Sequence, residues 1–314
     1  MTKKRIQVRN IFPGFLTLFL IAHISGAVPQ QKRPEVPYVP TPEEVVVEML
    51  KMADVGKNDV LYDLGCGDGR IVIKAVRELG CRGVGIDIDP VRIKECRKNA
   101  VNAGVTDKVE FFVKDLFQAD ISQATVVTLY LLSKVNLRLR PKLLRELAPG
   151  TRVVSHDFGM GEWEPDKSTV INDDDEKFPP VYDTFMLDFN WRVHHIHFWI
   201  IPANLTGTWQ WTMPAISGNK RYSLTIEQVF QKISGKTFEG SSAVPVNVKD
   251  GRIRGNKLEF TLDLKQKEFL RKVHFEGFVK GHAIEGFIRA EGEPETKVKW
   301  RAERILSTFR PIDK

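Results

Sequence analysis

Short apolar segments alternate with segments of helical periodicity over residues 43–201, and this alternation limits the fold more than any other feature of the sequence. The predicted strands are 60–64, 83–87, 109–113, 125–132, 152–155 and 195–201, and the predicted helices are 71–79, 91–103 and 136–147. Parallel strands joined by helical crossovers bury both faces of their sheet. The alternation therefore predicts an α/β domain over residues 43–203, built on an open, doubly wound parallel sheet.

A further helix is predicted directly before the first strand. Thr41-Pro42-Glu43-Glu44 offers a hydroxyl for the N-cap, a proline for the first helical position and a carboxylate three residues after the cap. We therefore expect a helix with Thr41 as its N-cap.

The pattern changes after residue 204, where every signal indicates β-structure. Polar and apolar residues alternate over 222–227, 258–264, 273–279 and 284–288. Turns are predicted at Asp250-Gly251, Gly255-Asn256 and Gly281, at the spacing of a meander. Residues 204–314 are therefore expected to form a small all-β domain, an antiparallel barrel or sandwich.

The N-terminus has the pattern of a targeting segment. Basic residues precede an apolar stretch, 11–24, and the small residues Ser25-Gly26-Ala27 follow it. Residues 1–27 are therefore predicted to be a cleaved signal peptide or, alternatively, an uncleaved membrane anchor. Either would place the rest of the chain outside. Residues 28–42 contain several prolines and are expected to form an extended linker.

Charge and cysteine content exclude two classes of function. The net charge is +7, but residues 36–204 carry 21 basic and 26 acidic side chains, whereas residues 205–314 carry 20 and 13. A nucleic-acid footprint should be basic on the domain that binds, so we expect no nucleic-acid partner. Cys66, Cys81 and Cys96 contain no CxxC pair, and neither a disulfide framework nor a zinc site is predicted around them.

A glycine-rich loop, Asp63-Leu64-Gly65-Cys66-Gly67-Asp68-Gly69-Arg70, follows the first predicted strand. Its spacing differs from the G-x-G-x-x-G of dinucleotide sites, and Asp63 and Asp68 would repel a diphosphate. A cationic ligand, such as a sulfonium with an amino-acid tail, suits an acidic loop better. Asp87 ends the second strand, where a carboxylate can accept from ribose hydroxyls, and Asp115 follows the third, where it can accept from an adenine amino group.

These features resemble the class I S-adenosylmethionine-dependent methyltransferases over residues 36–202. The match has three parts: the acidic glycine loop, Asp87 and Asp115. The resemblance implies a Rossmann-like sheet and S-adenosyl-L-methionine as the cofactor. A nucleotide fold with accidental acidic residues is the alternative.

The segment 36–46 is similar to the one that precedes this fold in the protein-lysine N-methyltransferases of archaea and mitochondria. Residues 129–133 lack the Asn/Asp-Pro-Pro-Tyr/Phe motif of nucleobase and glutamine amino-methyltransferases, which disfavours that route. The resemblance implies that Tyr38, Pro40 and Thr41 fold over the cofactor, although they also suit a plain linker and cap. The expected cofactor contacts are Tyr38, Pro40, Thr41, Asp63, Gly65, Cys66, Gly67, Asp68, Gly69, Asp87, Ile88, Asp115 and Leu116.

Candidate catalytic residues come from the carboxyl ends of the fourth and fifth strands and the segment after them. They are Tyr130, Asn136, His156 and Asp157. Tyr130 would orient an amine through its hydroxyl or ring, and His156 or Asp157 would accept a proton, directly or through water. A lysine desolvated beside a sulfonium loses its proton readily, so a dedicated base is not obligatory. Each residue could equally be a packing or capping residue.

Metal sites are weaker alternatives. His195 and His197 lie on one face of a predicted strand next to His194, but no carboxylate stands at a fixed spacing, so no metal is expected. The acidic run Asp173-Asp174-Asp175-Glu176 is interpreted as a solvated loop, with Ca²⁺ binding as a minor option.

The sequence thus predicts a methyltransferase acting on an amino group, with a protein lysine as the favoured acceptor. The basic β domain would dock an acidic protein or an anionic membrane surface. The rivals are methylation of a small lipophilic molecule held by the β domain, and an exported binding module whose cofactor loop is vestigial. Because S-adenosylmethionine is made in the cytosol, catalysis is expected on the cytoplasmic side, which conflicts with the exporting leader.

Overall fold

The structure is a computed structural model that describes residues 34–172, 192–213, 220–266, 269–292 and 297–312. These residues belong to one compact unit, Arg33–Lys314. The predicted leader, 1–27, and the acidic run Asp173–Glu176 lie outside the described residues. Among the helices of the described segments, none is both long and apolar enough to cross a bilayer.

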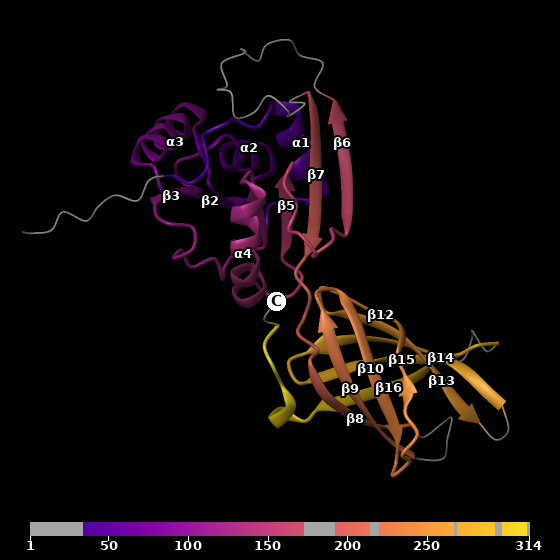
Figure 1. Ribbon diagram of the computed structural model, residues 1–314. Helices are drawn as coiled ribbons and strands as arrows, with labels where there is room; N and C mark the ends of the chain where they lie inside the picture. The colour runs from indigo at the N-terminus through magenta and orange to yellow at the C-terminus, as the bar shows by residue number, and fades with distance from the viewer. Residues whose placement is uncertain (1–33, 173–191, 214–219, 267–268, 293–296, 313–314) are drawn as a thin grey trace, which may run out of the picture. The chain divides into compact units, whose positions relative to one another are not determined.

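A seven-stranded sheet forms the first half of this unit (Figure 1). Its strand order is β3-β2-β1-β4-β5-β7-β6. The strands are β1 (Val60–Leu64), β2 (Arg82–Asp87), β3 (Val109–Val113), β4 (Val126–Leu129), β5 (Arg152–His156), β6 (Lys167–Asn172) and β7 (Val193–Ile200). The helices are α1 (Glu43–Met52), α2 (Arg70–Leu79), α3 (Pro90–Ala103) and α4 (Ser133–Glu146). The sheet domain expected from the alternating pattern is confirmed.

The alternation had suggested a wholly parallel sheet, but the observed sheet is mixed. Strands β1 to β5 are parallel, but β7 pairs antiparallel with β5, and β6 pairs antiparallel with β7. Strand β6 was not expected from the sequence. Because of the antiparallel register, His156 lies opposite Ile196. The start of β7 therefore approaches the carboxyl end of β5.

Helices cover both faces of the sheet, as a doubly wound fold requires. On one face, Val72 of α2 and Ile93 of α3 share a buried cluster with Leu61 of β1, and α1 contributes to the same cluster. On the other face, Leu139 of α4 packs with Leu64 of β1. Leu61 and Leu64 thus face opposite layers of the fold. Because apolar side chains fill both layers, polar side chains are found at the ends of the strands.

The expectation that Thr41 caps α1 is wrong. The helix begins at Glu43, Pro42 occupies the N-cap position and no side chain caps the helix. Thr41 is buried, and its hydroxyl lies 3.4 Å from Nδ1 of His156. The hydroxyl is therefore used in a long-range contact that local sequence patterns cannot report.

The second half of the unit is an antiparallel barrel (Figure 1). Its strands are β8 (Gly207–Met213), β9 (Lys220–Val229), β10 (Lys232–Glu239), β11 (Val246–Asn247), β12 (Lys249–Arg254), β13 (Lys257–Gln266), β14 (Phe269–Lys280), β15 (Ala283–Ala290) and β16 (Val298–Arg304), followed by the 3₁₀ turn η2 (Leu306–Thr308). Pairing of β9 with β10 closes eight of these strands into a ring, to which the short β11 is added. Closure removes the exposed sheet edges, so the barrel and not the sandwich is confirmed.

Aromatic side chains fill the described interior of this barrel. Phe260 stacks on Phe275 with ring centroids 4.5 Å apart, and Trp300 meets Phe275 edge-on at 5.2 Å. Trp211 packs against the same group, 5.8 Å from Trp300. Such ring pairs stabilise a core by more than the burial of their apolar area alone contributes.

One predicted turn in the barrel is wrong. Asp250-Gly251 lies inside β12, where the register shifts between Lys249 and Arg252 and Asp250 has φ +51°. The dipeptide forms a β-bulge, which uses the same backbone freedom as a turn but leaves the chain direction unchanged. The turns at Gly255-Asn256 and Gly281 are confirmed, because they join β12 to β13 and β14 to β15.

Candidate functional site

The strand order reverses between β1 and β4, and we call this position the switch point. From β1 the chain moves outward through β2 and β3, and then returns to place β4 and β5 on the other side of β1. Open α/β sheets bind ligands at the carboxyl ends of the strands at such a reversal. The glycine loop, residues 65–69, leaves β1 here, and Tyr130 directly follows β4.

The glycines of this loop make room for the chain's own side chains. A Cβ at Gly67 would lie 2.5 Å from Cε2 of Tyr38, and a Cβ at Gly65 would lie 2.8 Å from Cδ2 of Leu131. Both glycines have positive φ, +53° and +87°. The loop is thus held between segment 38–41 on one side and the residue after Tyr130 on the other. A side chain at Gly67 would displace Tyr38.

Two cysteines, one in the loop and one on α3, hold the loop in place. Sγ of Cys66 lies 3.8 Å from Sγ of Cys96 on α3, and Cys96 donates to the carbonyl oxygen of Gly67 at 3.0 Å. The contact with Cys96 and burial raise the pKa of the Cys66 thiol well above its ordinary value. The Cys66 thiol therefore stays protonated and buried, while the Cys96 thiol fixes the loop backbone through its hydrogen bond to Gly67.

Asp63 at the end of β1 is a buried carboxyl group. Thr128 of β4 donates to it at 2.8 Å, across the switch point. Burial, reinforced by the nearby charges of Asp87 and Asp68, raises the pKa of Asp63 to about 7. This carboxyl group is therefore poised to gain or lose its proton near neutral pH.

Asp87 at the end of β2 links two backbone segments. Its carboxylate accepts from the backbone N–H of Gly67 and of Asp89, each at 2.9 Å. Burial raises its pKa, and these backbone donors oppose that effect. Each carboxylate oxygen retains a lone pair for a further donor. Asp87 can therefore hold the loop and accept from ligand hydroxyls at the same time.

Asp68 is already paired within the chain. Arg70 donates to its carboxylate through Nη2 at 2.7 Å and through Nε at 3.0 Å, and also donates to the carbonyl oxygen of Thr41 at 2.9 Å. Burial acts in the opposite direction, but Arg70 holds the pKa of Asp68 below its usual value. Arg70 thus balances the charge of Asp68, and a contact of Asp68 with the cofactor stays a prediction.

Segment 38–41 crosses the switch point. Tyr38 lies against Gly67, with the guanidinium of Arg92 4.5 Å from its ring centre. Thr41 at the other end contacts His156 of β5. Pro40 lies between them and is half-buried. The segment predicted to cover the cofactor thus connects the glycine loop to the end of β5.

The remaining predicted cofactor residues lie farther along the sheet edge. Ile88 follows β2, and Asp115 and Leu116 follow β3, the edge strand. Asp115 accepts from the backbone N–H of Phe117 at 3.0 Å and thereby shapes this turn. All three are half-buried. They extend the line of loops that begins at Gly65.

Tyr130 and His156 stack on the other side of the switch point. Their ring centroids are 3.8 Å apart at an interplanar angle of 28°. Tyr130 is partly exposed, whereas His156 is fully buried. An incoming group can therefore reach Tyr130 more readily than the imidazole behind it.

Both ring nitrogens of His156 face other protein groups. Nε2 lies 2.9 Å from Nδ1 of His194 and 3.1 Å from Oδ2 of Asp157, and Nδ1 faces Thr41. Burial lowers the pKa of His156 to about 4, outweighing the nearby carboxylate. The histidine is therefore neutral at physiological pH and enclosed by protein.

Asp157 has an unusual backbone conformation, with φ +59°. Its N–H donates to the carbonyl oxygen of His195 at 2.6 Å, and its Oδ1 accepts from the N–H of the same residue at 2.8 Å. Although burial opposes it, the neighbouring His194 and His156 and this backbone donor lower the pKa of Asp157. The carboxylate is thus charged and turned toward β7.

Asn136 supports the loop after β5. Its amide nitrogen donates to the carbonyl oxygen of Phe158 at 2.9 Å and to Oγ of Ser155 at 3.3 Å. Ser155 also donates to Phe158, at 2.6 Å. Buried in α4, Asn136 fixes the residues that carry Asp157 rather than facing the switch point itself.

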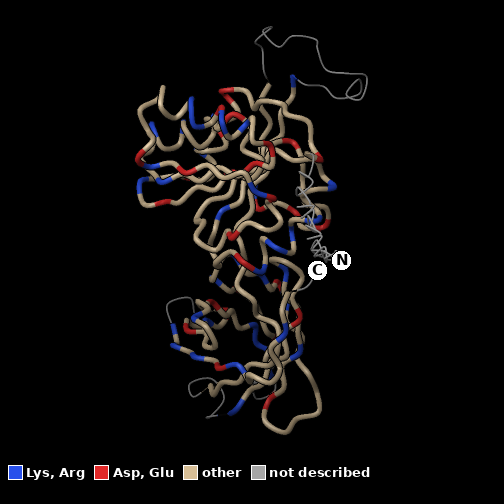
Figure 2. The backbone as a smooth tube through the Cα atoms, turned by 90° about the vertical axis from the view of Figure 1, so that its left-hand side faces the viewer, with Lys and Arg blue, Asp and Glu red and all other residues tan. Residues whose placement is uncertain are grey.

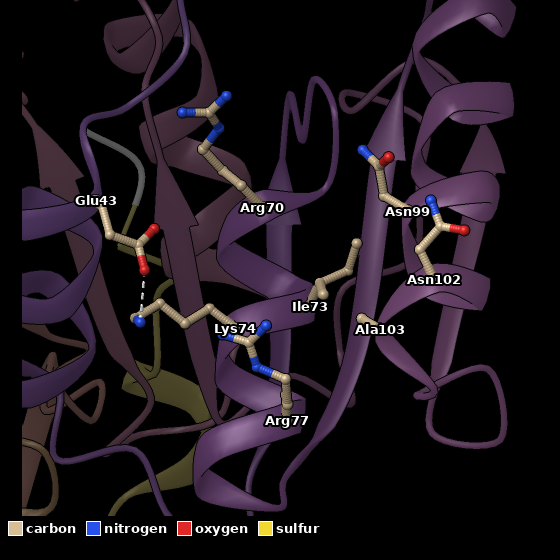
Figure 3. A pocket seen from close by; sticks show the side chains of 8 residues that line it. All are labelled: Glu43, Arg70, Ile73, Lys74, Arg77, Asn99, Asn102 and Ala103. Carbon is tan, nitrogen blue, oxygen red and sulfur yellow. Dashed lines mark hydrogen bonds and ion pairs between the residues drawn. The ribbon is translucent and has the colours of Figure 1, made fainter.

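A surface pocket of about 340 Å³ lies between α1, α2 and α3 (Figure 3). Arg70, Ile73, Lys74 and Arg77 of α2 line one side of it. On the other side are Asn99, Asn102 and Ala103 of α3, with Glu43 of α1 completing the wall. Lys74 pairs with Glu43 at 2.6 Å. The pocket is a groove between helices and not the candidate cofactor site.

Comparison with known proteins agrees with this geometry. Residues 63–167 match the family described as the ANTKMT methyltransferase domain. The chain is 49% identical over 141 residues to a protein-lysine N-methyltransferase of Saccharolobus islandicus, covering 45% of this chain and 88% of that protein. It is 32% identical over 189 residues to a human lysine N-methyltransferase named for the ATP synthase, covering 53% of this chain and 80% of that protein.

The chain belongs to the protein-lysine N-methyltransferase family. Its cofactor is S-adenosyl-L-methionine, as expected from the glycine loop and the two acidic strand ends. A solved structure titled an RNA methyltransferase from Salinibacter ruber, in complex with S-adenosyl-L-homocysteine, is 54% identical, covers 53% of this chain and 96% of its own, and has a TM-score of 0.45.

The contacts of three residues of this methyltransferase site were not anticipated from the sequence. Thr128 binds Asp63, Arg70 neutralises Asp68, and His194 contacts His156. Arg70 directly follows the glycine loop in the sequence, and this position could have suggested it as a partner for Asp68. Thr128 carries no local signal, and His194 had been considered only as a metal ligand. Each reaches its partner only through strand pairing.

Proposed function

We propose that this methyltransferase transfers a methyl group to the ε-amine of a lysine in a protein substrate, at the switch point between β1 and β4. The observation that supports this proposal is that Leu131, next to Tyr130, approaches Gly65 so closely that a Cβ at Gly65 would lie 2.8 Å from its Cδ2. Relatives of the chain are named for methylation of protein lysines. S-adenosyl-L-methionine supplies an electrophilic methyl group on a sulfonium.

The proposed cofactor-binding residues are those along the edge formed by β1, β2 and β3. Asp87 would accept from ribose hydroxyls, because both of its oxygens are already oriented by backbone donors. Asp115 would accept from the adenine amino group after β3. Asp63 lies behind the loop, where its ionised form would favour a cation. These donors and acceptors fit a nucleoside that carries a positive charge.

The proposed acceptor-binding residue is Tyr130. A lysine side chain must arrive without its proton, and desolvation at the strand ends favours that form. Tyr130 is partly exposed and held by its stacking on His156, so its ring and hydroxyl can align the amine. His156 and Asp157 would act as positioning residues, since protein groups surround both nitrogens of the imidazole. Asn136 would hold the loop that carries Asp157.

The chemical identity of the product tests this proposal. The full chain would be incubated with methyl-labelled cofactor and a library of lysine-containing peptides, and the products hydrolysed in acid and separated. We expect label in methylated lysine, and none when the lysines are chemically blocked beforehand. Label in any other amino acid, or equal labelling of blocked peptides, would refute the lysine acceptor.

The barrel offers less support for a small lipophilic acceptor. In the described part of its interior, Phe260, Phe275 and Trp300 are in direct ring contact. An apolar ligand would have to displace these rings. We therefore retain the protein lysine as the proposed acceptor.

We further propose that the barrel directs the enzyme to an anionic surface. Residues 205–314 carry an excess of seven basic side chains, and residues of both signs occur along the strands (Figure 2). Anionic membranes and acidic proteins both attract such a domain. Co-sedimentation with phosphatidylserine vesicles that weakens with added salt would support the membrane, and equal binding to phosphatidylcholine vesicles would contradict it. The leader, 1–27, and cytoplasmic-side catalysis stay predictions.

A further inference from the structure

Three side chains from two strands converge behind Tyr130. The atoms concerned are Nε2 of His156, Nδ1 of His194 and Oδ2 of Asp157. They are separated by 2.9 Å between the imidazoles, 3.1 Å from His156 to Asp157 and 3.8 Å from His194 to Asp157. All three side chains are nine-tenths buried or more. The cluster combines two imidazoles and one carboxylate around a single position.

The size of this triangle matches the ligand shell of a small cation. Zinc binds imidazole nitrogen and carboxylate oxygen at about 2.0–2.2 Å, and tetrahedral geometry then separates the ligand atoms by about 3.3 Å. The three observed distances lie on both sides of that value. The ligand atoms therefore need only small side-chain rotations to surround one ion.

The hydrogen bonds of the cluster leave an unsatisfied charge. The hydrogen bond between Nε2 of His156 and Nδ1 of His194 needs a proton on only one of these two nitrogens. The other nitrogen of His156, Nδ1, faces Thr41. Oδ2 of Asp157 is buried without a hydrogen-bond partner, as is Nε2 of His194. A buried carboxylate oxygen without a donor is costly unless a cation accompanies it. An ion bound between the two imidazoles and this carboxylate would supply that charge.

The surrounding backbone holds the carboxylate in place for such a role. Asp157 adopts a left-handed conformation that non-glycine residues rarely take, and its two hydrogen bonds with His195 fix its orientation. Oδ1 is used by the backbone N–H, which leaves Oδ2 directed at the imidazoles. Thr41 contacts the outer nitrogen of His156, in the way that metal-ligating histidines are oriented by a partner on their second nitrogen.

We propose that His156, Asp157 and His194 bind a Zn²⁺ ion, with one coordination position not filled by these three side chains. Two nitrogens and one carboxylate oxygen form a donor set that suits zinc among the common cations of proteins. The ion would join the ends of β5 and β7 and hold the imidazole on which Tyr130 stacks. This site adds to the proposed methyl transfer and does not depend on it.

Metal analysis of the full chain, prepared without a histidine tag, tests the proposal. The protein would be unfolded in guanidinium with a chelator, refolded with Zn²⁺, with Co²⁺ or with neither, and freed of loose metal by gel filtration. We expect about one equivalent of bound zinc per chain, a visible absorption band with Co²⁺, and a thermal midpoint that rises with zinc. S-adenosylhomocysteine binding would show that each sample is folded.

Variants assign the ion to these residues. His194→Gln and Asp157→Asn should retain less than about a tenth of an equivalent of zinc. His195→Gln is the matched control, because His195 lies on the same strand and is absent from the cluster, and it should bind zinc as the unaltered chain does. If a ligand variant does not fold, the cobalt spectrum of the unaltered chain decides. A folded chain without zinc, without a cobalt band and with a midpoint that zinc leaves unchanged would overturn the proposal.

Discussion

The two sides of the switch point are built in different ways. The proposed cofactor side consists of the turns after β1, β2 and β3, and its glycine loop and Asp87 stand within 25 residues of one another in the sequence. The proposed acceptor side consists of Tyr130 after β4, His156 at the end of β5, Asp157 directly after it, and His194 on β7. Parallel pairing of β4 with β5 brings Tyr130 beside His156, and antiparallel pairing of β7 with β5 adds His194.

This difference shows which parts of a site follow from local rules. On the cofactor side, backbone groups do much of the positioning, since Asp87 is held by two N–H donors. On the acceptor side, side chains position one another, as in the stacking of Tyr130 on His156 and the contact of Thr41 with the same ring. Substitutions on the first side should affect cofactor affinity, and those on the second should affect turnover.

Asp87→Ala should have the largest effect on the cofactor side. It removes the proposed ribose acceptor and the bond that holds Gly67, so we expect affinity for S-adenosylmethionine to fall about 100-fold in isothermal titration. Asp89→Ala is the control. Asp89 caps α3 through Val91, so its loss should cost about 1 kcal/mol of stability and leave affinity nearly unchanged. Equal losses of affinity in the two variants would argue against a direct contact.

Tyr130→Ala should separate turnover from cofactor binding. Loss of the stacked ring should lower kcat about 100-fold while the Kd for S-adenosylmethionine changes less than about threefold. Tyr130→Phe keeps the ring and reports on the hydroxyl alone, and Tyr62→Phe on β1 controls for a tyrosine elsewhere in the domain. A Tyr130→Ala enzyme with normal kcat would place the acceptor elsewhere.

Cofactor affinity should change with pH for a positively charged ligand but not for a neutral one. Asp63 has a pKa of about 7, so its carboxylate form dominates only above that pH. Affinity for the cationic S-adenosylmethionine should therefore rise a few-fold from pH 6 to 8, while affinity for the neutral S-adenosylhomocysteine should change little. Titrations of both ligands at each pH measure the difference. Asp63→Asn should remove it, and parallel curves for the two ligands in the unaltered chain would exclude Asp63 as the cause.

The carboxyl group of Asp63 should also make the stability of the protein depend on pH. Because the folded-state pKa of Asp63 is raised above the ordinary value of 3.8, the folded form binds the proton more tightly between about pH 4 and 7. Its contribution to stability should therefore decline as pH rises through that window. Denaturant unfolding of Asp63→Asn should show a weaker decline than the unaltered chain, and identical slopes would contradict this assignment.

Arg70→Gln should have the smallest effect. The pair with Asp68 is partly exposed, so its loss should cost less than about 1 kcal/mol of stability and weaken cofactor binding only two- to threefold, by about 0.5 kcal/mol. Arg77→Gln, on the same helix and paired with Glu78, controls for loss of an exposed cation. A large loss of affinity in Arg70→Gln alone would show that its bond to Thr41 orders the segment over the loop.

Local patterns were sufficient to predict those parts of the protein whose structure depends on neighbouring residues. Strand and helix periodicity indicated the order of elements from β1 to β5, and the spacing of Asp63, the glycines and Asp87 indicated the cofactor, because a turn and the strand ends beside it are set locally. Closure of the barrel could not be distinguished from a sandwich, since alternation reports which side chains face inward and not which edges pair.

The tertiary structure alone decided the acceptor side. His194 was considered as a metal ligand and set aside, because no carboxylate stands at a fixed spacing from the histidines. The antiparallel pairing of β7 with β5 brings Asp157 to it across 37 residues, and the hydroxyl expected to cap α1 contacts His156 instead. Contacts between distant segments follow from how strands pair and layers pack, and one sequence carries no periodic signal for them.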